Sequence, residues 1–217
     1  MGKFVKILKE KDVGSIGIGA MIVFIAMVLV AGIAASVLIQ TSTTLESQAL
    51  ATGQETTAEV SSGLDVVDIF GKKVGTTLNW IVITIRPRAG SSDIDLAQTV
   101  VEISDSSTKN FLTYDDSTYE DSVDIDGDLF AYDHFTTDDT HFSIIVLEDA
   151  DGSCDSETSA VINSGDYVML GVNTSSCFTG LSVREDIWGL VLPEEGAPGV
   201  INFQCPPSFT DTIIELQ

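Results

Sequence analysis

Three aspartates at alternate positions give the chain its first candidate for metal chemistry. The segment "VDIDGDLFAYD" contains Asp124, Asp126 and Asp128 within a polar stretch. Closely spaced carboxylate oxygens in a loop are the ligands that Ca²⁺ prefers in proteins. The calcium-loop signature is incomplete, because Gly127 comes too early and no glutamate stands at the twelfth position. We therefore treat the three aspartates as a candidate Ca²⁺ site, with a solvated turn as the alternative, and no motif requires a cofactor.

The three cysteines are candidates for redox or metal chemistry. None of Cys154, Cys177 and Cys205 belongs to a CxxC pair, and two histidines are too few to complete a familiar zinc site. Outside the cell, one disulfide and one leftover thiol would be expected, and we prefer the pair Cys154–Cys177 because both flank a short predicted strand region. Three buried thiols are the alternative. The sequence has no catalytic triad pattern and no phosphate-binding glycine loop, so we predict no enzymatic activity.

One asparagine is a candidate for modification. Asn173-Thr174-Ser175 is the only N-x-[ST] sequon in the chain, and it lies beside the end of a predicted strand. A glycan there would add bulk and solubility to a surface protein. An unmodified asparagine is the alternative.

The N-terminal segment changes abruptly from charged to apolar. Four of the ten basic residues precede Gly14, and residues 15–45 then contain no charged side chain and no proline. The 25 residues 15–39 would span about 37 Å as a helix, enough to cross a hydrocarbon core of about 30 Å. This helix is apolar on all sides, and we expect it to end at Gly63. Small residues cluster from Ala31 to Ser36, as in helices that pack closely together. A discarded secretory signal, a retained anchor and a helix that packs with its own kind are the three possible explanations, and the small residues favour the last.

The rest of the chain is acidic and rich in short strands. Residues 15–217 carry 31 acidic and six basic side chains, a net charge of −25. Such a surface repels nucleic acid phosphates and suits an extracellular or high-salt environment. Short apolar or alternating runs separated by Gly, Asp, Ser and Pro clusters predict an antiparallel β-sandwich, with Trp80 and Trp188 as core anchors. The expected strands cover residues 77–86, 98–104, 110–114, 129–135, 141–148, 166–172, 186–192, 199–204 and 212–217.

The N-terminal residues also resemble a known family. "GSIGIGAMIVFIAMVLVAGIAASVLIQTS" closely resembles the N-terminus of archaellins, the archaeal flagellins, and residues 17–31 are its specific part. The C-terminal "LVLPEEGAPGVINFQCPPSFTDTIIELQ" resembles the end of the family's outer domain more loosely. Bacterial type IV pilins carry a glutamate at the fifth mature position. Gly19 stands there in this chain, which favours an archaellin.

The resemblance implies a type IV pilin-like precursor in three parts. Residues 1–14 would be a class III signal peptide, which a prepilin-type membrane peptidase removes between Gly14 and Ser15. Residues 15–62 would be the helix of the filament core, and residues 63–217 an outer immunoglobulin-like antiparallel β-sandwich, giving an α+β fold. An archaellum membrane platform with its assembly and rotation ATPase would extract the helix from the cytoplasmic membrane.

The implied function is structural. The subunit would polymerise, alone or with other archaellins, into the extracellular helical filament used for swimming. An archaeal adhesion pilin and a membrane-anchored surface protein are the alternatives. The core helix would pack through a set of apolar and small residues: Ile16, Ile18, Ile22, Phe24, Met27, Leu29, Gly32 and Leu38.

Overall fold

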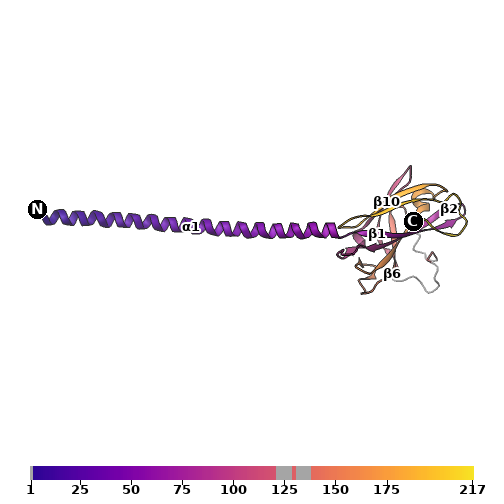
Figure 1. The fold of residues 1–217 in the computed structure, drawn as a ribbon, viewed down its shortest axis with the longest axis horizontal. Coiled ribbons are helices and arrows are strands. Elements are labelled where there is room, and N and C mark those ends of the chain that lie inside the picture. The colour runs from indigo at the N-terminus through magenta and orange to yellow at the C-terminus, as the bar shows by residue number, and fades with distance from the viewer. Residues whose placement is uncertain (1, 121–128, 131–137) are drawn as a thin grey trace. The chain divides into compact units, whose positions relative to one another are not determined.

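A long helix and a β-domain make up the chain (Figure 1). The computed structural model describes residues 2–120, 129–130 and 138–217, with side chains from Ile16 onward. Within this part, residues group into two compact units, Met1–Gln54 and Glu55–Gln217. The last helical turns therefore belong to the same unit as the strands.

Helix α1 spans Gly2–Ser61, 60 residues without a break. It begins well before the predicted start at residue 15 and ends two residues before Gly63, where the sequence predicts its end. The absence of proline keeps every i to i−4 hydrogen bond available. Helix α1 is also the one described helix that is long and apolar enough to cross a membrane.

The β-domain is largely antiparallel, which confirms the predicted class of a long apolar helix followed by an antiparallel β-domain. Nine strands form one sheet in the order β11-β10-β4-β5-β6-β9-β2-β1-β12, and β3-β8-β7 form a second. Only the β5–β6 pair among the described ladders runs parallel. The strands are β1 (Leu64–Val74), β2 (Thr77–Pro87), β3 (Ile94–Asp95), β4 (Val100–Ser104), β5 (Lys109–Glu120), β6 (His141–Glu148), β7 (Cys154–Ser156), β8 (Ser159–Ile162), β9 (Tyr167–Asn173), β10 (Asp186–Leu192), β11 (Gly199–Gln204) and β12 (Ile213–Glu215). Two short helices, η1 (Leu96–Gln98) and α2 (Thr174–Phe178), complete the described elements.

Strand β1 is absent from the predicted strands. Its sequence, LDVVDIFGKKV, does not alternate between buried and exposed residues. Register shifts between Val66 and Asp68 and between Lys72 and Lys73 interrupt its pairing with β2, and such bulges break the period of two that sequence patterns rely on. The predicted strand at residues 129–135 lies largely outside the described residues.

The main core lies on one face of the large sheet, where Ile81, Ile83 and Ile85 of β2 meet Leu170 and Val172 of β9. A second, smaller cluster lies on the opposite face and contains Val82, Phe130, Ile145 and Met169. The two tryptophans are not deep core anchors, contrary to the sequence prediction. Trp80 is half-buried beneath the Lys72 ammonium, which lies 5.1 Å from its ring centroid, and Trp188 is 46% exposed.

Candidate assembly helix and carboxylate cluster

The apolar surface of α1 has no cover within the described chain. The seven large residues predicted to pack in a filament core are 61–72% exposed. These residues are Ile16, Ile18, Ile22, Phe24, Met27, Leu29 and Leu38. Side chains from residue 16 to Gln54 are all exposed, so the helix must be covered by something outside the chain.

The glycines of α1 do not accommodate any neighbour within the chain. A Cβ added to Gly17, Gly19 or Gly32 would find no atom within 4 Å. Glycine in a helix interior costs roughly 0.5–1 kcal/mol relative to alanine, and the fold of the single chain does not require it here. Close approach of another helix is a physical reason for small residues at such positions.

Three threonines after the apolar run donate hydrogen bonds to backbone carbonyls of the helix itself. Thr41 donates to the Leu38 carbonyl at 3.0 Å, and Thr44 donates to the Gln40 carbonyl at 2.8 Å. Because a helix pairs its own backbone N–H and C=O groups, its apolar part can enter either a bilayer or a bundle of like helices. Residues Gly14 and Ser15 lie within the backbone of α1, and their side chains lie outside the described part.

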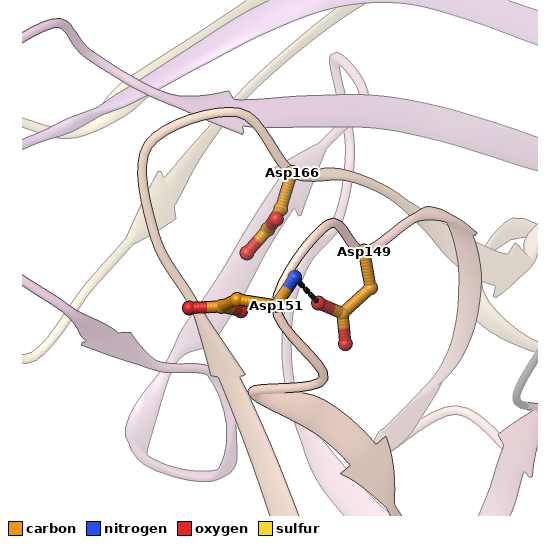
Figure 2. Close-up of side chains that lie close together, drawn as sticks. All are labelled: Asp149, Asp151 and Asp166. Atoms are coloured by element: carbon orange, nitrogen blue, oxygen red, sulfur yellow. Dashed lines mark hydrogen bonds between the residues drawn. The ribbon is translucent and has the colours of Figure 1, made fainter.

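The predicted Ca²⁺ residues Asp124, Asp126 and Asp128 lie outside the described residues, and metal binding there stays a prediction. The structure brings three other aspartates together (Figure 2). One carboxylate oxygen from each of Asp149, Asp151 and Asp166 lies within 4.8 Å of the others. Asp149 and Asp151 follow β6, and Asp166 precedes β9, so the pairing of these two strands brings the loops together.

Backbone N–H groups and neighbouring side chains hold each of these carboxylates. Asp149 accepts hydrogen bonds from four consecutive backbone N–H groups, those of residues 151–154. Asp166 is 1% exposed and accepts from the Asn163 N–H at 2.8 Å. Asn163 also donates its side-chain amide to Asp151 at 2.7 Å, which lowers the pKa of that carboxyl below its usual value.

This carboxylate cluster has the donor chemistry of a hard-cation site, because Ca²⁺ and Mg²⁺ take oxygen ligands. Sequence analysis did not identify it. The D-x-D-G spacing of residues 149–152 is a weak signal, and Asp166 follows 15 residues after Asp151. Only the tertiary pairing of β6 with β9 joins the three.

The predicted glycosylation site is a structural cap. Asn173 is 8% exposed, and its side-chain oxygen accepts from the N–H groups of Ser175 and Ser176 at the start of α2. Thr174 is fully buried and donates to the Leu78 carbonyl at 2.8 Å. Glycosylation of Asn173 stays a prediction.

The predicted Cys154–Cys177 disulfide is wrong, because all three cysteines are free thiols. Cys154 lies on β7, opposite Ala160 of β8, whereas Cys177 lies in α2. Burial raises the pKa of the Cys177 thiol to about 11 and that of Cys205 to about 12. Such thiols are protonated at neutral pH and therefore react slowly.

Comparisons with known proteins agree over both the helix and the β-domain. The family model of archaeal-type flagellin matches residues 14–203. Flagellin B2 of Methanocaldococcus jannaschii is 43% identical, over 99% of this chain and 100% of its own length. Flagellin B1 of Methanococcus voltae is 40% identical, over 94% of this chain and 95% of its own length.

Two solved structures share the fold. The crystal structure of archaeal flagellin FlaB1 from Methanocaldococcus jannaschii aligns with a TM-score of 0.66 at 32% identity, covering 72% of this chain and 97% of that one. A chain of the archaeal flagellum of Methanospirillum hungatei aligns with a TM-score of 0.64 at 13% identity, covering 91% of this chain and 98% of that one.

Proposed function

The chain belongs to the archaeal-type flagellin family, and we infer on that premise that it is a structural subunit of the archaeal flagellum filament. The observation that carries this function is the surface of α1, which is free of charge over residues 15–45 and whose described side chains from Ile16 to Gln54 are all exposed. Copies of the same helix are the cover that this surface fits. An adhesion pilin or an anchored monomer is not favoured, because full-length relatives at 43% and 40% identity are flagellins.

The energy of burial explains why the helix polymerises. Each large apolar side chain left in water costs roughly 1.5–3 kcal/mol relative to burial. The seven predicted packing residues alone would make a free, hydrated monomer unfavourable by about 10–20 kcal/mol. The bilayer covers the helix before assembly and like helices cover it afterwards, so the apolar surface never meets water.

Removal of residues 1–14 fits the same energetics. Lys3, Lys6, Lys9 and Lys11 would otherwise enter the helical core, where each unpaired ion costs several kcal/mol. The family match begins at residue 14, beside the proposed cut between Gly14 and Ser15. Cleavage by a prepilin-type membrane peptidase therefore acts as a gate on assembly.

The remaining partners follow from a helix that starts in the membrane and finishes in a filament. A membrane platform and an assembly ATPase would supply the work of extraction. Subunits would then add to an extracellular filament, alone or with other archaellins. The filament would turn as a whole for swimming, so torque would pass through noncovalent contacts between neighbouring helices.

N-terminal sequencing of protein sheared from cells tests this function. We expect filaments whose subunits begin at Ser15. Protein that begins at Met1 and stays in the membrane fraction as detergent-soluble monomers would overturn both the processing and the assembly.

A further inference from the structure

One side of the β-domain exposes apolar side chains that the fold does not cover. We call it the β10 face and define it by Phe111, Trp188, Leu190 and Val200. Phe111, Trp188 and Val200 are 54%, 46% and 55% exposed, and Leu190 lies half-buried between them. In the sheet, Leu190 of β10 pairs with Val200 of β11 and with Glu102 of β4, which in turn pairs with Phe111 of β5. The four side chains therefore form one continuous surface.

The charges at the centre of this face are internally paired. Lys109 Nζ lies 2.6 Å from Glu102 Oε1 and 5.2 Å from the centroid of the Phe111 ring. The ammonium thus neutralises Glu102, which pairs with both Leu190 and Phe111 in the sheet. Asp186, two residues before Trp188 on the same side of β10, is the carboxylate at the edge of the face, and it accepts a hydrogen bond from the Gln204 side chain at 2.7 Å. On a chain whose residues 15–217 carry a net charge of −25, an apolar face whose central charges are paired is where another acidic molecule can approach with less repulsion.

The backbone beneath this face is tightly held. Gly189 lies between Trp188 and Leu190, and a Cβ at this position would overlap the Glu102 carbonyl oxygen. The close contact of β10 with β4 fixes the direction of the two neighbouring side chains. A pre-organised face loses little conformational entropy on binding.

We propose that the β10 face binds the β-domain of a second copy of this chain inside the filament, an inference that rests on the proposed function. Four partly exposed side chains are too few to hold two free domains together, because a stable interface commonly buries at least about 1,000 Å² of total surface. Packing of the helices holds the β-domains of neighbouring copies at high effective concentration, where a small face suffices. A second copy is the occupant because it is the acidic molecule that assembly brings to this face. A contact between unlike patches of two copies also extends naturally into a helical filament.

The first test measures the exposure of Trp188 directly. The chain has two tryptophans, so the variant Trp80→Phe leaves Trp188 as the only indole. Phenylalanine keeps an aromatic ring at position 80, where the Lys72 ammonium lies against the ring. Acrylamide quenching of its fluorescence would be compared between filaments and the full chain dispersed in mild detergent. We expect the quenching constant to fall by about twofold or more on assembly, because contacts at the centre of an interface exclude water. Equal quenching in the two states would overturn the proposal.

The second test compares two charge-matched double variants in filaments of the full chain. Trp188→Glu with Val200→Glu places two carboxylates on the β10 face. Leu147→Glu with Val74→Glu adds the same charge at positions of similar exposure, 50% and 45%, outside that face. We expect the first pair alone to lower the temperature at which filaments dissociate, while both pairs keep the unfolding temperature of the dispersed chain.

The outcomes separate this inference from the function beneath it. Filaments that form normally with an accessible Trp188, or that tolerate both double variants equally, would refute the contact between copies and leave the filament function intact. With either result, the β10 face would remain exposed in the filament and could bind a different partner. Failure of the unaltered chain to form filaments would instead refute the proposed function, and the contact with it.

Discussion

A single carboxylate in the apolar run of α1 should abolish assembly without harming the fold of the chain. The change is Leu29→Glu, at a side chain that is 61% exposed. The Leu29 side chain is not in the hydrophobic core of the β-domain, so its loss leaves that domain intact. The closest carboxylate that follows along the helix is Glu46.

The magnitude follows from two costs per subunit. Loss of the buried leucine removes roughly 1.5–3 kcal/mol. Burial of an unpaired carboxylate among apolar helices adds several kcal/mol more, or forces the group to take up a proton. Taken together at about 4 kcal/mol or more, these costs raise the subunit concentration needed for assembly by roughly 1,000-fold, since each 1.4 kcal/mol is a factor of ten.

Leu50→Glu is the matched control. Leu50 belongs to the same helix and is 63% exposed, but Glu46 and Glu55 already flank it with carboxylates. The assay is the amount of sedimentable filament from cells, divided by the amount of subunit in the membrane fraction, so that poor membrane insertion is not read as poor assembly. Leu29→Gln separates loss of apolar surface from burial of charge. Filament yields and melting temperatures of Leu29→Glu equal to those of Leu50→Glu would refute the reasoning.

Three further predictions concern the β-domain. Asn173→Ala should reduce the free energy of unfolding by about 1 kcal/mol through loss of the α2 cap. Asn173→Asp keeps the capping oxygen and should unfold at a temperature near that of the wild type, and equal losses of stability in the two variants would contradict the capping role. Thiol titration of the unfolded chain without reductant should find three free thiols, and fewer than three would show that a disulfide is present. In the folded chain, the half-buried Cys177 should react before the buried Cys154 and Cys205. A hydrogen bond from the backbone N–H of Thr140 lowers the pKa of the Asp138 carboxyl to about 2. The ionised carboxyl therefore stabilises the folded chain fully above about pH 4, the usual pKa of an aspartate, and this stabilisation is lost as the pH falls toward 2. Asp138→Asn should flatten the thermal stability over that window, and an unchanged acid profile would contradict this.

The β-domain shows where a pattern-based prediction of strands succeeds and fails. Strands β2, β6, β10 and β11 lie close to their predicted ranges, because each has apolar or alternating residues bounded by turn residues. β1 was missed because its bulges remove the alternation, and the parallel pairing of β5 with β6 has no local signal. Strand order is a property of contacts between distant segments, which the period of a single strand does not encode.

The carboxylate cluster and the cysteines show the same limit. Carboxylates that lie close together in the chain predict a metal site at Asp124, Asp126 and Asp128. The cluster that forms joins Asp149 and Asp151 to Asp166, through loops that the β6–β9 pairing brings together. Cys154 and Cys177 flank a predicted strand region, but they fold into a small sheet and a separate helix.

The long helix and its need for a cover follow from local properties of the sequence. No charged residue lies between Gly14 and Leu45, and the apolar run in this segment has no polar face. Both properties can be read from neighbouring residues, so the need to exclude water from this helix is evident without the fold. Which side chains of the β-domain meet depends on how its strands pair, and no local pattern shows it. The exposure of Trp188, the pairing of Lys109 with Glu102 and the meeting of the three aspartates all depend on strand register and order, which arise from contacts between distant parts of the chain.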